Sequence, residues 1–213
     1  KHNMFYSFDH GQIHFVSIST ETDYDGAPFK QTFGDQMTWL RKDLETAVAN
    51  RRRTPWIVVL GHRPVYSSMM GYSSKGKPTG QSLVIQNTFE QLLKDYRVDL
   101  YMVGHVHSYE RFHPVFRNEP QCDTTCTNST NVYHNPESTV HVVNGAAGCE
   151  EGLSPSLKYL SILPASAKVF NKDYGYGVLE TSTQGNQLMM NWKFFSASKD
   201  VVEDEMTIIK NTI

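Results

Sequence analysis

The sequence has 213 residues, of which 39% are hydrophobic and 20% are charged, and its formal net charge is −2. These values are those of an ordinary globular protein that buries one large core, and the balanced charge excludes the strongly basic surface of nucleic-acid-binding and membrane-surface proteins. No apolar run approaches the ~20 residues that span a bilayer, so we expect no membrane partner.

The beginning of the sequence predicts a β-hairpin. Residues 5–8 and 13–19 are rich in aromatic and β-branched residues, and the turn-forming sequence Asp9-His10-Gly11-Gln12 separates them. Neither an initiator Met nor a signal peptide precedes this hairpin, so we expect the sequence to begin in mid-domain.

A helix is predicted to follow from Asp35, which is a favourable N-cap residue. The basic run at 51–53 suits the C-terminal end of a helix, and Pro55 stops it. Its apolar face is expected to contain four residues at helical spacing: Met37, Leu40, Leu44 and Val48.

Two buried strands end in glycine and histidine. Residues 56–60 lead into Gly61 and His62, and residues 100–103 lead into Gly104, His105 and a second histidine at position 107. The long loop 62–80 and a predicted helix at 82–96 connect them, so the strands should be parallel with a right-handed crossover. Both histidine-bearing ends should therefore lie at one edge of one sheet, where α/β proteins bind their ligands.

The spacing of the two histidines that follow the second strand, His105 and His107, indicates two metal ions. His105 and His107 are two residues apart, which places their Cα atoms roughly 6.5 Å from each other in an extended chain. Bridged metal ions lie about 3.5 to 4 Å apart, so each histidine is better placed to hold its own ion than to share one. Gly104 allows the chain to approach an ion closely.

The second half of the sequence predicts more strands. Residues 139–144 form a strand that runs into a glycine-rich turn, 150–170 appears irregular, 178–181 and 187–195 form a hairpin, and 205–210 is a last strand. We find no internal repeat.

The cysteines favour an oxidising compartment. Cys122 and Cys126 lie in a polar loop that also holds the glycosylation sequon at Asn128, and a disulfide together with secretion explains both features. Two free thiols and a chance sequon are the alternative. The third residue, Cys149, is then either a free buried thiol or paired with something outside this chain.

The sequence resembles the carboxyl-terminal part of the catalytic domain of purple acid phosphatases. The matching motifs are FYSFDHGQIHFVSISTE, VVLGHRPVY, DLYMVGHVHSYER, VHVVNGAAGCEEG and DYGYG, and they extend over nearly the whole sequence. The resemblance implies that residues 1–213 are part of one calcineurin-like metallophosphoesterase domain. Its fold class is α/β (α+β), a β-sandwich of two mixed sheets flanked by helices.

The resemblance also implies a dinuclear site. It assigns His62 and His105 to a divalent ion (iron, zinc or manganese) and His107 to iron(III). The family's carboxylate, tyrosine and asparagine ligands lie upstream of this sequence, so the amino-terminal half of the enzyme must come from a partner chain or is missing. Where plant members have two loop histidines, this sequence has Gly71 and Tyr72. Our first candidate for the proton donor is therefore a histidine of the missing half, and Tyr72 is the second.

The expected function is acid hydrolysis of small phosphomonoesters by metal-bound hydroxide in a secreted or vacuolar/lysosomal enzyme. A homo-oligomer is compatible with the sequence. The alternative is a non-catalytic metal-binding or interaction module that kept the fold and the three histidines but lost the other ligands.

Overall fold

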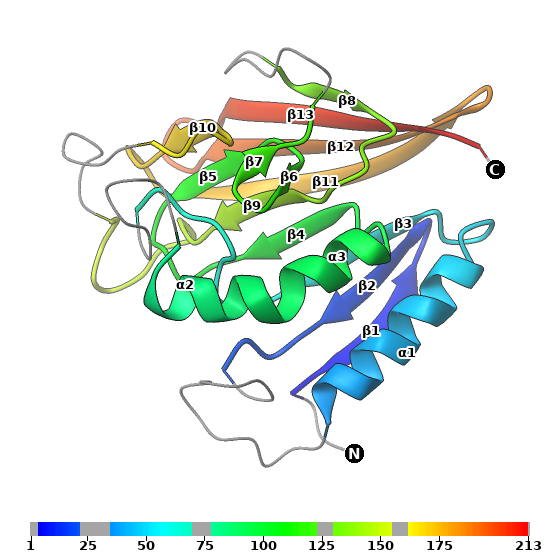
Figure 1. Ribbon diagram of the computed structural model, residues 1–213. Helices are drawn as coiled ribbons and strands as arrows, with labels where there is room; N and C mark the ends of the chain where they lie inside the picture. The colour runs from blue at the N-terminus through cyan, green and yellow to red at the C-terminus, as the bar shows by residue number, and fades with distance from the viewer. Residues whose placement is uncertain (1–3, 22–34, 70–77, 123–129, 155–161, 213) are drawn as a thin grey trace.

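A computed structural model describes residues 4–21, 35–69, 78–122, 130–154 and 162–212. Its main element is a mixed seven-stranded sheet in the order β1-β2-β3-β4-β9-β5-β10 (Figure 1). These strands are β1 (Tyr6–His10), β2 (Ile13–Ser17), β3 (Trp56–Leu60), β4 (Leu100–Val103), β9 (Val140–Asn144), β5 (Tyr109–Phe112) and β10 (Ser166–Phe170).

A second sheet has four strands in the order β11-β12-β13-β8, and β6 and β7 form a small ribbon. The bounds are β11 (Gly175–Gln184), β12 (Gln187–Ser196), β13 (Val201–Asn211), β8 (Val132–His134), β6 (Val115–Phe116) and β7 (Glu119–Pro120). The helices are α1 (Gln36–Ala49), α2 (Gly80–Ile85) and α3 (Gln91–Asp95), with the π-helical turn η1 (Gln86–Glu90) between the last two.

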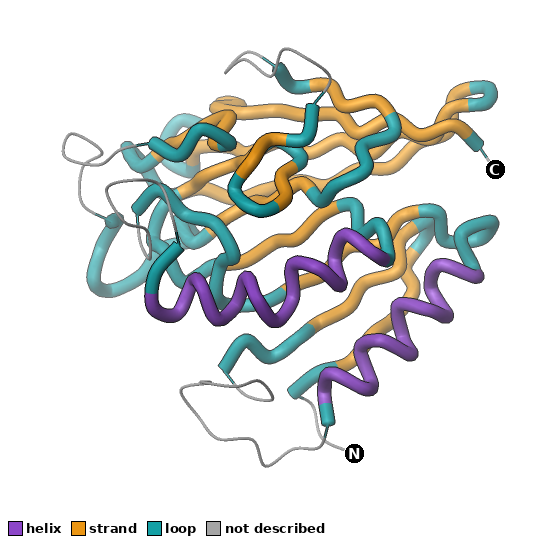
Figure 2. The backbone as a smooth tube through the Cα atoms, in the orientation of Figure 1, coloured by secondary structure: helices purple, strands orange, loops and turns teal. Residues whose placement is uncertain are grey.

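The helices cover one face of the seven-stranded sheet and the four-stranded sheet covers the other (Figures 1 and 2). The helical side is packed by residues such as Leu44 and Phe89, which have no exposed surface. The side between the sheets is packed by large aromatic residues such as Trp56 and Phe194. This arrangement confirms the predicted sandwich of two sheets flanked by helices.

Strands β2, β3, β4 and β9 are parallel neighbours. Val58 pairs with Leu100 and Leu60 with Met102, so β3 and β4 end side by side. The predicted common edge for the histidine-bearing strand ends is thereby confirmed.

Helix α1 begins as predicted, because the Asp35 side chain accepts a hydrogen bond from Thr38 N at 3.0 Å. Its predicted apolar face is wrong at Val48, which is 39% exposed, whereas Ala47 is 2% exposed. The buried face of a helix recurs every three or four residues, and it runs here from Leu40 through Leu44 to Ala47 rather than to Val48.

Five strands lie where no strand was predicted: the short β6, β7 and β8, and two strands of the main sheet, β5 and β10. β10 lies within the stretch 150–170 that appeared irregular, and β5 begins directly after the histidines. β5 lacks the apolar pattern of a strand because Glu110 and Arg111 are buried in it. Ser68 and Ser166 donate hydrogen bonds to the carboxylate of Glu110. The guanidinium of Arg111 pairs with Asp204 of β13. Long-range pairing of β5 with β9 and β10 supplies the backbone hydrogen bonds.

The cysteines agree with the predictions as far as the structure describes them. Cys122 is disulfide-bonded, whereas Cys149 is a free and half-buried thiol. Cys126 and the sequon residue Asn128 lie outside the described residues, so their roles stay predictions. Among the described helices, none has the length and apolarity needed to cross a membrane.

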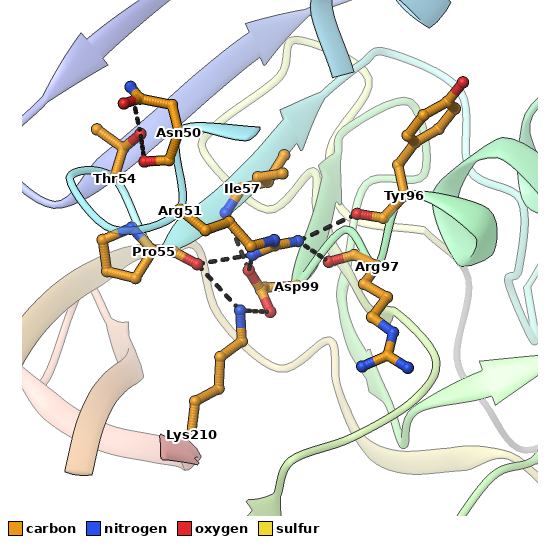
Figure 3. Close-up of polar contacts among 9 residues, drawn as sticks. All are labelled: Asn50, Arg51, Thr54, Pro55, Ile57, Tyr96, Arg97, Asp99 and Lys210. Atoms are coloured by element: carbon orange, nitrogen blue, oxygen red, sulfur yellow. Dashed lines mark hydrogen bonds and ion pairs between the residues drawn. The ribbon is translucent and has the colours of Figure 1, made fainter. Parts of the chain in front are cut away.

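Figure 3 shows an ionic cluster around Asp99, which lies at the start of β4, whereas His105 follows the end of the same strand. Asp99 is 4% exposed and precedes β4; its carboxylate accepts from Ile57 N at 2.9 Å and pairs with Arg51 at 3.4 Å and Lys210 at 2.5 Å. Arg51 also donates to the carbonyls of Pro55, Tyr96 and Arg97. The Arg51–Asp99–Lys210 cluster thus ties the end of α1 to β3, β4 and β13.

Candidate metal centre

The structure brings two of the three predicted histidines, His62 and His105, together at one sheet edge. The His62 and His105 ring centroids lie 4.9 Å apart, and Nε2 of His62 faces Nδ1 of His105 at 3.1 Å. The pKa of His105 is lowered, first by burial and then by the charges of Arg63, His62 and His107. Low pKa values keep imidazole neutral, which is the form that binds metals.

The strand ends fix these side chains through the backbone. Gly61 N donates to Met102 O at 3.0 Å, and Gly104 N donates to His62 O at 3.1 Å. His105 follows with φ 63°, in the left-handed region that non-glycine residues rarely adopt. Such a conformation persists only where the surrounding structure imposes it, and it is typical of functional sites.

The first two histidines suit one shared cation. Ligand nitrogens lie about 2.0–2.1 Å from a bound zinc ion, so neighbouring ligands of one ion are about 3 Å apart. The 3.1 Å separation of His62 Nε2 and His105 Nδ1 matches this spacing. In the part of the chain that the structure describes, no carboxylate hydrogen-bonds to either ring, although hard cations require oxygen ligands.

The ring of His107 is oriented by a thiol. Cys149 Sγ lies 2.9 Å from His107 Nδ1 and 2.8 Å from Gly152 O. A carbonyl can only accept, so the thiol hydrogen points to Gly152 and the sulfur accepts from Nδ1–H. The lone pair of His107 is then on Nε2, which is the nitrogen left for a metal. Glu151 completes a group whose ligand atoms lie within 4.8 Å of one another.

The glycine-rich turn after β9 packs directly on the histidine loop. A Cβ at Gly145 would lie 2.0 Å from Val106 O, so only glycine fits there. Gly145 N donates to Ser108 O at 3.1 Å, and Ser154 N donates to His107 O at 2.8 Å. The sequence showed both segments but gave no sign of this contact, because it depends on β9 lying beside β4.

Arg63 is a further site residue that the sequence analysis missed. Its Nε donates to Glu21 Oε1 at 2.7 Å, and its Nη1 lies 3.1 Å from His105 Nε2. Thr20 Oγ1 accepts from the backbone N–H groups of His62 and Arg63 and so holds the start of this segment. The motif Gly-His-Arg-Pro was the available signal. Tyr72 lies outside the described residues.

Comparisons with known proteins identify the family of this chain. A family model of calcineurin-like phosphoesterases matches residues 4–109. The chain therefore has the fold of that class of phosphoesterases. A second model, described as iron/zinc purple acid phosphatase-like protein C, matches residues 138–205, and the chain belongs to the purple acid phosphatase family.

Individual relatives support the assignment. The chain is 33% identical to an acid phosphatase of Aspergillus ficuum, over 98% of this chain and 38% of the relative. It is 31% identical to purple acid phosphatase 22 of Arabidopsis thaliana, over 96% of this chain and 40% of the relative. A purple acid phosphatase from yellow lupin (Lupinus luteus) seeds superposes with a TM-score of 0.74 at 27% identity, over 97% of this chain and 33% of that chain. The chain thus spans about two fifths of the length of these curated relatives.

Proposed function

We propose that this protein is an acid phosphatase that hydrolyses small phosphomonoesters at a dinuclear metal site, to which it contributes His62, His105 and His107. The observation that carries the proposal is the 3.1 Å approach of His62 Nε2 to His105 Nδ1 at the ends of two parallel strands. Relatives over nearly the whole chain are named acid phosphatases.

Bound cations would supply Lewis acidity to a water molecule and to the phosphoryl oxygens. The residues of this chain hold them in place: His62 and His105 take a divalent ion (iron, zinc or manganese), and His107 takes iron(III) through Nε2. The thiol of Cys149 positions the ring of His107, which lowers the reorganisation that binding requires. The iron/zinc family model supports iron with a divalent metal.

The leaving group needs a proton. A histidine from residues outside this chain is our first candidate, Tyr72 the second and solvent the third. A Tyr72→Phe variant tests the second candidate, because loss of a proton donor slows the hydrolysis of esters with poor leaving groups more than that of esters with good ones. Equal slowing of alkyl and nitrophenyl phosphates would remove Tyr72 from the mechanism.

The remaining ligands must come from residues that this sequence does not contain, and we propose the amino-terminal half of the same enzyme as their source. The chain spans 38% of the length of its Aspergillus relative, which leaves room for such a half. On the β1–β2 edge, Tyr6 and Phe8 are 49% and 48% exposed, and Phe8 stacks on Phe15 at 5.2 Å. This aromatic surface continues the face that packs between the two sheets, so it suits a further packed layer.

We also propose a secreted or vacuolar/lysosomal location. The disulfide at Cys122 supports an oxidising compartment, with Cys126 as its partner and Asn128 as a glycosylation site. Mass spectrometry of the protein after protease digestion without reduction tests both assignments. A free Cys126 and an unmodified Asn128 would contradict them.

The test of the function uses protein expressed from its complete coding sequence. We expect about two metal ions per molecule, a violet colour and hydrolysis of an aryl phosphate at pH 5. Alanine at His62, His105 or His107 should lower hydrolysis by at least about 100-fold, whereas His134→Ala, an exposed histidine on β8, should not. Colourless protein with sub-stoichiometric metal and no hydrolysis would instead indicate the non-catalytic module.

A further inference from the structure

Arg63 is held beside the metal centre by two contacts with different chemistry. Glu21 accepts from its Nε at 2.7 Å, and both side chains are partly exposed, at 22% and 23%. Nη1 points the other way and lies 3.1 Å from Nε2 of His105. The carboxylate therefore orients the guanidinium through Nε and leaves Nη1 beside His105 Nε2.

The contact with His105 has a consequence for its proton. A guanidinium can only donate, so Nε2 of His105 accepts from Arg63 and the ring proton lies on Nδ1. If Nδ1 binds a cation, as its position opposite His62 Nε2 indicates, a neutral ring must carry its proton on Nε2. Two donors would then face each other at 3.1 Å, so Arg63 must move away from Nε2 and an acceptor must bind both N–H groups.

A cavity of about 210 Å³ lies at this place. It is lined by Arg63, Pro64 and His105 on one side and by residues 79–82 on the other. The cavity has room for a small acidic group, and its lining includes the hydroxyl residues Thr79 and Ser82 besides Arg63 and His105. Nδ1 and Nε2 lie on different edges of the imidazole ring, so a group bound at Nε2 is not the phosphoryl group at the cations.

We propose that Arg63 is a specificity-determining residue that binds a second anionic group of the substrate, together with the Nε2–H of His105. The preferred substrates are phosphomonoesters that carry another phosphate or a carboxylate near the ester. Glu21 is the positioning residue for Arg63. This inference rests on the proposed function, because it names the substrate class of the same site.

Matched substrates test the inference. Glycerol 3-phosphate and 3-phosphoglycerate differ at the end remote from the ester, where the second carries a carboxylate. We expect the unaltered enzyme to have the higher kcat/KM for 3-phosphoglycerate, and Arg63→Gln to lower that value about 10- to 100-fold, with a clearly smaller loss for glycerol 3-phosphate. Arg63→Lys should retain part of the preference, since it keeps the charge but loses the planar fork.

Two further measurements separate specificity from support of the fold. The metal content of Arg63→Gln should equal that of the unaltered protein, and calorimetric binding of a non-hydrolysable bisphosphonate should weaken by the same factor as kcat/KM. Arg52→Gln, which changes an exposed arginine beyond α1, is the matched control and should change nothing.

Each outcome bears on the inference. Equal loss for both substrates, or loss of metal in Arg63→Gln, would show that Arg63 only supports His105 and would overturn it. An unchanged substrate preference in Arg63→Gln would also overturn it while leaving the phosphatase function intact. Failure of the unaltered protein to hydrolyse any phosphomonoester would instead overturn the proposed function itself.

Discussion

The two ends of the parallel strands carry polar clusters of opposite character. At the end of β4, His105 meets His62 and Arg63 in a half-open site, and its ring nitrogens are arranged toward a ligand. At the start of β4, Asp99 is 4% exposed and is surrounded by Arg51, Lys210 and a backbone N–H (Figure 3). The histidine cluster lies near the surface, whereas the carboxylate of the other cluster is buried beneath two partly exposed cations.

The difference lies in what each cluster has already bound. Both carboxylate oxygens of Asp99 and both Nη atoms of Arg51 are paired within the chain, so this cluster holds the elements together. The histidine cluster has donors and acceptors whose best partners are a cation and an anion. Charged and titratable residues therefore indicate function at the edge where they are incompletely matched.

The largest predicted effect is the loss of stability when Asp99 is removed from its ionic cluster. Asp99→Ala leaves the cations of Arg51 and Lys210 without their carboxylate, so we expect the free energy of unfolding to fall by about 3–5 kcal/mol. Urea titration followed by circular dichroism measures it. Asp95→Ala, at an exposed position in α3, is the matched control. A loss no larger than that of the control would mean that the cluster does not hold the sheet edge.

A second prediction concerns a buried carboxylate in the helical layer. Glu90 accepts hydrogen bonds from the Tyr66 hydroxyl and from Arg117 N, and burial raises its pKa from 4.5 to about 7. The folded state thus binds the proton more tightly, and this contribution to stability is complete below pH 4.5 and is lost as the pH rises through 7.

Glu90→Gln should remove this pH dependence, which we expect to amount to at most about 3 kcal/mol. Unfolding curves of both proteins at pH 4.5, 6 and 8 make the comparison. If the difference between variant and unaltered protein is the same at all three values, Glu90 does not titrate in this range.

The third prediction concerns the thiol beside His107. Cys149→Ala removes the acceptor for Nδ1–H, and we expect metal affinity to fall about 10-fold. Cys149→Ser keeps an acceptor and should lose less. Competition with a chelator, followed by absorbance of the metal-loaded protein, measures the affinity. Equal affinities of the serine and alanine variants would show that the thiol does not position the ring.

The smallest effect should be that of His62→Ala on folding. His62 is exposed, so the free energy of unfolding of the metal-free variant should change by less than about 1 kcal/mol, although metal retention is lost. Metal analysis and urea titration on the same preparation test both statements. Destabilisation as large as that of Asp99→Ala would remove the contrast between the two edges.

Local patterns predicted the parts of the molecule that local physics determines. The apolar strands β3 and β4 and their terminal glycines placed His62 and His105 at one edge, because parallel strands connected by a helix must end together. The N-cap of α1 was predicted for the same reason, since Asp35 needs only its neighbouring N–H groups.

The missed features depend on pairings distant in the sequence. β5 contains Glu110 and Arg111, whose burial makes sense only with Ser68, Ser166 and Asp204 in place. The contact of Cys149 with His107 and that of Arg63 with Glu21 likewise join segments about 42 residues apart. No periodicity within one segment predicts such partners.

The central claim is that His62 and His105 share one cation and that His107 holds another. A crystal structure of the metal-loaded protein, with anomalous diffraction at the iron and zinc edges, tests it most directly. We predict one peak about 2.0–2.2 Å from both His62 Nε2 and His105 Nδ1, and a second at His107 Nε2. Peaks at neither place, or a single ion bound at His107 Nδ1 with Cys149 and Glu151, would contradict it.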